Sequence, residues 1–466
     1  MTTLTETTTP TVTREEAFDV PFLPEKGRLV EFENGHQLVY VPKRGEVFNI
    51  STWVTTGSIH EDDVNNGVSH FLEHLMFKGT EKAKPGEFDK AMESMGAIIN
   101  AATWKDFTFY YITGPNMNNG GNFLKALEMH ADMLLNSTLP EAEIGPQYDP
   151  DDASYKGEKR ERSVVIEEIA MREDQPWTKV FNGMNHAMYA NQHPYQRDVI
   201  GTRQIIGNIP RETIEHYYKS WYAPGSMMTI VVGDFEWETL QSNVAQAFKF
   251  GTEHLKHPGK QLWQLGQLNP DVAVAPKPGA PIVQEGDVQT GFAMLGFHGP
   301  APTDLKASIA LDCISYCLGE SRSSRLHQKL VEQAEPRLFN SIGSGQSAQR
   351  LGNVFHISGN FAGKNYLAAL GQVNSELTRL LEAEPIAELE LQRAKQNLKA
   401  GFAETAETAS GIAETIGESY TILNNLDGYI KYLSVLEQVT LDEVNAAARQ
   451  YLNPELAYTA VLLPKG

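Results

Sequence analysis

Apolar side chains recur at helical spacing between residues 68 and 76. They occupy positions i, i+3, i+4, i+7 and i+8 of this segment: Val68, Phe71, Leu72, Leu75 and Met76. This spacing is typical of a helix that buries one face in a protein core. The segment is therefore predicted to form an amphipathic helix, whose other face carries polar side chains.

Other segments have the pattern of strands. Residues 48–55 and 108–112 are rich in β-branched and aromatic side chains, and residues 96–103 are small or β-branched. The segments 96–103 and 108–112 would form a hairpin, and long helical patterns separate the strands. This order predicts α+β domains, in which helices pack on a largely antiparallel sheet.

One pattern occurs twice, at an offset of 230 positions. In each copy an amphipathic helix is followed by an aromatic residue, a proline and a β-rich strand. The matched residues are Ile205-Ile206 with Val435-Leu436, Ile209 with Val439, Ile214 with Val444, Trp221 with Tyr451, Pro224 with Pro454, and 229–232 with 459–462. Because a single offset holds throughout, we interpret the chain as two copies of one α+β unit.

Proline and glycine accumulate between the two copies, as in a linker. We therefore predict an N-terminal domain at residues 21–254, a linker at 255–282 and a homologous C-terminal domain at 283–466. Residues 1–20 begin with a Thr-rich polar stretch and are predicted to be a disordered tail.

Composition narrows the possible partners. The 466 residues include 59 acidic and 39 basic side chains, so the formal net charge is −20. This charge argues against a nucleic-acid or anionic-membrane partner. Because no segment resembles a membrane span or a targeting sequence, we expect a cytoplasmic protein. The two cysteines, Cys313 and Cys317, lie among apolar residues and are predicted to be buried core residues.

The polar face of the predicted helix carries His70, Glu73 and His74. Two imidazoles at i and i+4 lie on one helical face, so both can bind a single metal ion. Glu73 would lie beside that metal, within reach of a bound water. The spacing H-x-x-E-H is the inverted form of the zinc-protease motif. It makes a zinc-dependent peptidase the leading hypothesis, against the alternative of three solvated side chains on an outer face.

A catalytic zinc normally takes three protein ligands, so a third is expected elsewhere in the chain. A helical pattern at residues 161–169 carries Glu161 and Glu168, which are two turns apart and share a face. One of these carboxylates could bind the metal while the other orients a ligand histidine.

The chain resembles the family of inverted zinc peptidases that includes pitrilysin, insulin-degrading enzyme and the mitochondrial processing peptidase. The resemblance covers nearly the whole chain, and its size is similar to the small two-domain branch. The motifs that carry it are His70-Phe71-Leu72-Glu73-His74 with Phe77-Lys78-Gly79-Thr80, Asn100-Ala101-Ala102-Thr103, Glu161 with Glu168, His193-Pro194-Tyr195 with Gly201-Thr202, and Ser323-Ser324-Arg325-Leu326.

The resemblance implies a zinc site with His70, His74 and Glu168 as ligands. Glu161 would support the site, and Glu167 is the second choice as ligand. The implied reaction is amide hydrolysis with a zinc-bound water as nucleophile and Glu73 as general base. The segment 145–159 is predicted to be a polar insertion that loops out near the site.

The resemblance also implies how a substrate binds. In relatives the segment that matches 96–103 is an edge strand, to which the substrate backbone adds as a further strand. We therefore expect an extended peptide with Asn100 and Ala101 near the scissile bond. His193, a lone histidine before Pro-Tyr, is predicted to be structural.

Catalytically complete relatives carry an Arg and a Tyr, after the Ser-Ser-Arg-Leu motif, that are absent here. Their positions correspond to Val331 and to Leu338, or Phe339 if one residue is inserted, and the repeat offset places no metal motif at 300–304. The resemblance thus implies a zinc-bearing subunit of a heterodimer, whose homologous partner supplies the Arg and Tyr, or otherwise a homodimer. The alternative is a non-catalytic scaffold or a peptide-binding subunit.

Overall fold

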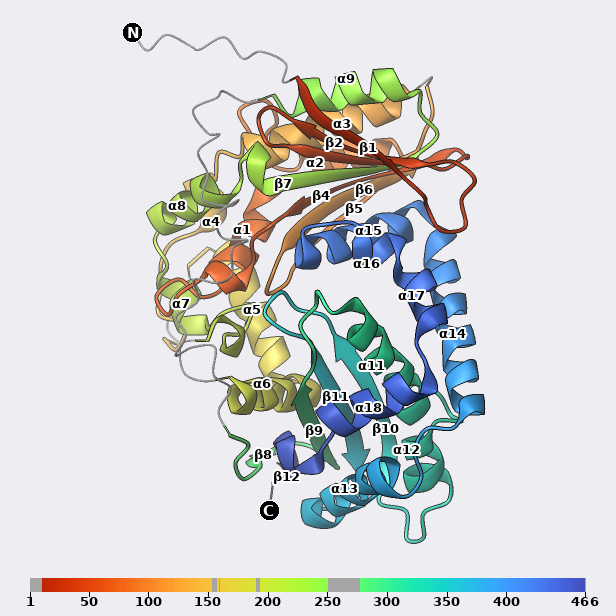
Figure 1. Ribbon diagram of the computed structural model, residues 1–466. Helices are drawn as coiled ribbons and strands as arrows, with labels where there is room; N and C mark the ends of the chain where they lie inside the picture. Colours follow the sequence, from red (N-terminus) through yellow and green to blue (C-terminus); the bar gives the residue numbers. More distant parts are fainter. Residues whose placement is uncertain are drawn as a thin grey trace. The chain divides into compact units, whose positions relative to one another are not determined.

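The computed structural model describes residues 11–118, 120–152, 157, 158, 160–189, 193–249 and 277–465. The chain divides into two compact units. The first unit comprises Met1–Ile169, Arg197–Gln267 and Ala403–Ile430, and the second comprises Ala170–Gln196, Leu268–Phe402 and Lys431–Gly466. Each unit contains one sheet packed with helices (Figure 1).

The first unit contains a seven-stranded sheet in the order β1-β2-β3-β7-β4-β6-β5. Its strands are β1 Val12–Phe18, β2 Gly27–Phe32, β3 Gln37–Pro42, β4 Val47–Val54, β5 Ile98–Thr103, β6 Thr108–Pro115 and β7 Met227–Gly233. Only the β3–β7 pair is parallel among these neighbours. Strand β5 pairs with β6, as the predicted hairpin at 96–112 requires, and it lies at one edge of the sheet, as the family resemblance implied.

Helices cover both faces of this sheet (Figure 1). They are α1 Val68–Met76, α2 Glu87–Ser94, α3 Gly121–Leu135, α4 Glu141–Ile144, α5 Glu161–Asp174, α7 Arg203–Asn208, α8 Arg211–Trp221, α9 Trp237–Ala247, α15 Ala409–Leu423 and α16 Asp427–Ile430. The main core joins α1 and its neighbouring helices to one face, and α15 packs against β4 and β7. The predicted apolar stripe of α1 is fully buried in that core.

The second unit has a five-stranded sheet in the order β10-β11-β9-β12-β8. Its strands are β8 Ile282–Gly286, β9 Gly291–His298, β10 Phe339–Ser347, β11 Val354–Phe361 and β12 Tyr458–Pro464. Its helices are α6 Pro176–Met188, α11 Leu305–Leu318, α12 Arg325–His327, α13 Tyr366–Glu382, α14 Glu388–Ala406, α17 Tyr432–Gln438 and α18 Leu441–Tyr451. Cys313 and Cys317 are free and buried in this core, as predicted.

The predicted duplication is visible in the bounds of the elements and in the sheet order. Helices α8 and α18 begin and end 230 positions apart. In each unit the strand after this helix pairs in parallel with one neighbour (β3 or β8) and antiparallel with the other (β4 or β9). The fold class of two homologous α+β domains is therefore confirmed.

The division between the two units is discontinuous in sequence, which the contiguous boundaries 21–254 and 283–466 did not anticipate. Helix α6 belongs to the second unit and α15 to the first, so corresponding helices of the two copies are exchanged. Helical periodicity shows that a helix buries one face, but it does not show which sheet covers that face.

The predicted tail at 1–20 is too long, because Val12–Phe18 form β1 and pair with β2. The side chains from Val12 to Ala17 are exposed, so this edge strand depends on backbone hydrogen bonds that composition does not reveal. Most of the predicted linker at 255–282 lies outside the described residues. None of the described helices is long and apolar enough to cross a membrane.

Candidate metal centre

Helix α1 is held at its first turn by a buried carboxylate. Glu61 accepts hydrogen bonds from the backbone N–H groups of Gly67 and Ser69, at 2.7 and 2.9 Å, and from the Asn66 side chain at 2.8 Å. These contacts satisfy amide groups that a helix leaves unpaired at its start. Burial raises the pKa of Glu61 above its usual value. Glu61 was not predicted as part of the site, because it lies outside the H-x-x-E-H motif.

A close backbone contact also positions this turn. Gly67 and Gly201 both have positive φ values, of 93° and 79°. A Cβ at Gly67 would lie 2.6 Å from the Ile200 carbonyl oxygen, and one at Gly201 would lie 2.4 Å from that of Asn66. Only glycine fits this approach without displacing the backbone. The Gly201-Thr202 motif therefore supports the start of the metal-site helix.

Three predicted ligand side chains meet at one point of the first unit. The Nε2 atoms of His70 and His74 lie 3.6 and 3.5 Å from Oε2 of Glu168. One ligand atom each of His70, His74 and Glu168 forms a group in which all three atoms lie within 4.8 Å of one another. Helix α1 supplies both imidazoles and α5 supplies the carboxylate. Among the described residues this is the one group of three such side chains that could hold a metal ion.

The spacing of these atoms fits zinc. Ligand atoms at 2.0–2.2 Å from a tetrahedral zinc ion are separated by about 3.4 Å. The two measured nitrogen–oxygen distances lie close to that value and exceed those of good hydrogen bonds. Two imidazoles with one carboxylate are a known catalytic zinc set that leaves a fourth position open.

A second carboxylate orients one of the imidazoles. Oε2 of Glu161 lies 3.4 Å from Nδ1 of His74, and Oε1 of Glu161 lies 2.7 Å from Nζ of Lys78. Burial opposes ionisation of Glu161, but the bonds to His74 and Lys78 hold its pKa below the usual value. No role was predicted for Lys78, although its position one helical turn after His74 indicates that the two side chains lie on the same face.

Glu73 lies on the same helix and contacts the edge strand. The hydroxyl of Thr103, the last residue of β5, donates a 2.5 Å hydrogen bond to Oε2 of Glu73. This contact joins the H-x-x-E-H helix to the strand on which Asn100 and Ala101 lie. The structure therefore brings Glu73, the metal cluster and the end of β5 into one region of the first unit.

Other residues singled out from the sequence lie apart from the cluster. Glu167 is exposed and is not part of it. His193 belongs to the second unit, where its Nδ1 accepts a hydrogen bond from the Tyr195 N–H and its ring stacks on Tyr189. In the segment 145–159, Tyr148 contacts α7: its backbone N–H donates a hydrogen bond to the Gly207 carbonyl oxygen.

The second copy carries apolar residues where the first has its carboxylates. At the repeat offset, Glu161 and Glu168 correspond to Leu391 and Leu398 of α14, which contribute to the core of the second unit. Val331 and Phe339, at two of the expected Arg and Tyr positions, are buried in that core, and Leu338 packs against it. The described part of the second unit therefore has neither the metal ligands nor an Arg–Tyr pair at these positions.

The protonation of His74 should make the thermal stability of the metal-free protein depend on pH. Burial by itself lowers the pKa of His74, but Glu161 and Glu168 outweigh it and raise the pKa to about 9. A protonated His74 paired with the two carboxylates stabilises the folded state. Because an unfolded histidine has a pKa of about 6.5, this contribution to stability is complete below pH 6.5 and is lost as the pH rises through 9. We expect the Tm in chelator to fall by about 3–6 °C between pH 6.5 and 9.5.

Differential scanning fluorimetry at a series of pH values measures this change. The Glu161→Gln variant should show a flatter profile, because it removes one of the charges that raise the pKa. Identical pH profiles for wild type and variant would show that Glu161 does not control the protonation of His74.

The fold and the site together define a duplicated α+β chain whose described residues include one candidate metal centre, built on an H-x-x-E-H helix. Two family models match it: Insulinase (Peptidase family M16) over residues 41–203, and Peptidase M16 inactive domain over residues 208–398. The chain belongs to peptidase family M16, the insulinase family. The family assignment made from the sequence motifs is therefore confirmed.

Individual relatives are similar along nearly their whole length. The chain is 29% identical over 451 residues to zinc protease PqqE of Helicobacter pylori, covering 95% of this chain and 94% of that protein. It is 28% identical over 418 residues to the uncharacterized zinc protease YmxG of Bacillus subtilis, covering 90% and 93%. The crystal structure of a protease from Helicobacter pylori matches with a TM-score of 0.79 at 27% identity, covering 95% of this chain and 100% of that one.

Proposed function

We propose that this protein is a zinc-dependent endopeptidase that cleaves extended peptides. The observation that carries the proposal is the meeting of His70, His74 and Glu168 at zinc-ligand spacing, with Glu73 on the same helix. Several relatives, including those of Helicobacter pylori and Bacillus subtilis, are named zinc proteases, which supports the same reaction class.

In this proposal His70, His74 and Glu168 hold the zinc ion, and Glu161 with Lys78 keeps His74 in its ligand orientation. When bound, zinc supplies Lewis acidity that polarises a peptide carbonyl and lowers the pKa of water toward about 7. Glu73 acts as the general base: its carboxylate accepts a proton from the attacking water and delivers it to the leaving amine. The Thr103 hydroxyl orients that carboxylate through its hydrogen bond.

The substrate would bind as an added strand on β5. As the last strand of its sheet, β5 has one side without a partner strand among the described residues. An extended peptide can use such an edge through main-chain hydrogen bonds, which tolerate varied side chains. Asn100 and Ala101 would then flank the scissile bond, because Thr103 of the same strand contacts the proposed base.

Full activity would require a partner. The buried apolar residues at the expected Arg and Tyr positions favour a homologous subunit that supplies both groups inside a two-chain chamber. Loss of one oxyanion donor costs about 10²–10³-fold in rate, so the isolated chain should be slow. The same residues also support a second candidate function, a non-catalytic scaffold or peptide-binding subunit.

A quenched extended peptide tests the proposal. We expect slow hydrolysis by the zinc-loaded chain, loss of hydrolysis in chelator, and recovery on addition of zinc. A homologous chain that lacks H-x-x-E-H but retains Arg and Tyr should increase the rate about 100-fold or more. Assembly of the two chains without zinc-dependent cleavage would support the scaffold, and cleavage that survives zinc removal would contradict the proposed mechanism.

A further inference from the structure

The sheet of the first unit has a second face beside the proposed substrate strand. In the register of the sheet, Ile98 of β5 pairs with Thr113 of β6, and Thr113 pairs with Asn49 of β4. Directly paired residues project from the same face. On this face α15 covers the sheet, and its Gly417 lies so close to Trp53 that a Cβ there would meet the indole ring.

A cavity of about 220 Å³ lies between this face and α15. Strands β4, β5 and β6 and the first half of α15 line it, with Asn49, Ile98, Tyr111 and Glu414 among the lining residues. A water molecule in the liquid occupies about 30 Å³, so the cavity can accept one long side chain. Ile98 is 66% exposed, so the cavity wall continues to the open edge of β5.

The floor of the cavity contains a hydrogen-bond acceptor that no described residue uses. Asn49 is only 1% exposed, and its Nδ2 donates a 2.8 Å bond to Oγ1 of Thr113. Its Oδ1 is buried and has no partner among the described residues. A buried carbonyl oxygen of this kind is costly unless a donor reaches it, so it favours a ligand that carries N–H groups.

The cavity lining has a negative charge and no positive one. Glu414 is exposed at its rim, and no described Lys, Arg or His forms an ion pair with it. The aromatic rings of Phe109 and Tyr111 stack along the wall, with centroids 6.0 Å apart. Aromatic faces attract cations, and apolar walls suit the alkyl stem of a long basic side chain.

We propose that this cavity binds a lysine or arginine side chain of the peptide that pairs with β5. The stem would lie along Ile98 and Tyr111, and the cationic head would reach Asn49 Oδ1 and Glu414. Residues of an added strand alternate between the two faces, so every second side chain projects from this face, and one beside Ile98 would lie next to the cavity. The inference rests on the proposed peptide binding at β5 and adds a selectivity for basic side chains.

Binding can be measured without cleavage by using the zinc-loaded Glu73→Gln protein. The probes are fluorescein-labelled nonapeptides of Ala, Ser and Gln, with Lys, norleucine or Glu placed at each position in turn. At one position we expect the Lys peptide to bind about fivefold to tenfold more tightly than the norleucine peptide. A Glu73→Gln protein that also carries Glu414→Gln should bind the Lys and norleucine peptides with affinities that differ by less than about twofold. A Glu73→Gln protein that carries Glu414→Lys should bind the Glu peptide most tightly.

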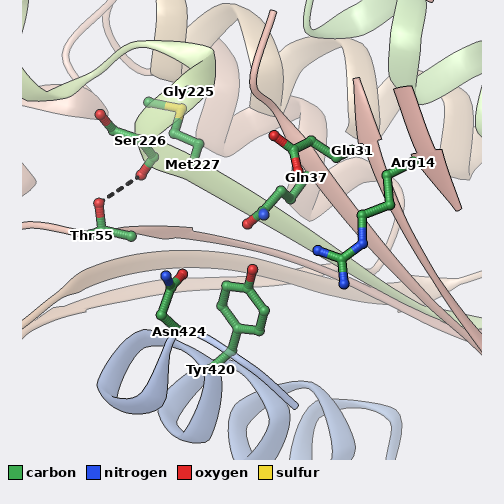
Figure 2. A pocket seen from close by; sticks show the side chains of 9 residues that line it. All are labelled: Arg14, Glu31, Gln37, Thr55, Gly225, Ser226, Met227, Tyr420 and Asn424. Atoms are coloured by element: carbon green, nitrogen blue, oxygen red, sulfur yellow. Dashed lines mark hydrogen bonds between the residues drawn. The ribbon is translucent and has the colours of Figure 1, made fainter. Parts of the chain in front are cut away.

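A second cavity of the same unit offers a matched control. It has a volume of about 270 Å³ and is lined by both Arg14 and Glu31, so it has no single charge preference (Figure 2). It lies against Tyr420 and Asn424 at the other end of α15, next to strands distant from β5 in the sheet order. Glu31→Gln removes one carboxylate, as Glu414→Gln does, and should leave the preference for Lys unchanged.

The results separate this inference from the proposed function. A Lys preference that survives Glu414→Gln, a preference for norleucine, or no binding of any peptide would overturn the inference. Loss of the preference only in the Glu414 variants would support it, even if wild type cleaved no peptide. If the Glu414 variants lost the preference and wild type cleaved no peptide, the endopeptidase proposal would be wrong, whereas the proposed site for basic side chains would be supported.

Discussion

Replacing Glu73 by Gln should abolish peptide hydrolysis while leaving the zinc content unchanged. The carboxamide keeps the size of the side chain and can still accept the hydrogen bond from Thr103, but it cannot take up a proton at neutral pH. Removal of a general base costs about 10²–10⁴-fold in rate. The measurements are kcat on a quenched peptide and metal content by elemental analysis of the dialysed protein.

The Thr103→Val variant provides the graded comparison. It removes only the hydroxyl that orients Glu73, so we expect a loss of about tenfold or less, with zinc retained. Undiminished hydrolysis by Glu73→Gln would exclude this carboxylate as the base. Loss of zinc from that variant would instead show that Glu73 contributes to metal binding.

Replacing Glu168, the proposed third zinc ligand, should have the second large effect, which is a loss of zinc affinity. The adjacent residue Glu167 provides a matched control on the same helix. Oε2 of Glu168 lies 3.5–3.6 Å from both imidazoles, whereas Glu167 is exposed. Glu168→Gln should weaken zinc binding by more than about 100-fold, because it replaces an anionic ligand by a neutral amide. Glu167→Gln removes the same charge one residue away and should change zinc binding by less than about twofold.

Competition with a fluorescent zinc chelator measures both affinities, and thermal unfolding with and without zinc gives an independent reading. Zinc should raise the Tm of wild type and of Glu167→Gln, but not that of Glu168→Gln, because ligand binding stabilises the folded state by mass action. Equal zinc affinity in the two variants would remove Glu168 from the ligand set. A selective loss in Glu167→Gln would assign the ligand role to the neighbouring residue.

Local periodicity accounts for most of what could be predicted. His70, Glu73 and His74 share a helical face by spacing alone, and the seven-residue interval of Glu161 and Glu168 places both on one side of α5. The repeat offset of 230 positions predicted two units of the same kind, and the two sheets have the same strand relationships. These are short-range or whole-copy regularities, which a linear sequence contains directly.

Long-range packing decided the features of the fold that were not predicted. The exchange of α6 and α15 between the units depends on which apolar surfaces meet, and both helices have the same kind of amphipathic pattern. The strand β1 forms through backbone bonds to β2, and its side chains from Val12 to Ala17 are exposed.

By itself, then, the sequence determined that His70, Glu73 and His74 share one helical face, and it determined the α+β class and the duplication, because helical and strand periods order side chains locally. Only the tertiary structure decided that Lys78 joins Glu161, that Thr103 contacts Glu73, and that a cavity with an unused Asn49 oxygen lies under α15. Such contacts join residues far apart in the chain, and they exist only once the elements have packed against one another.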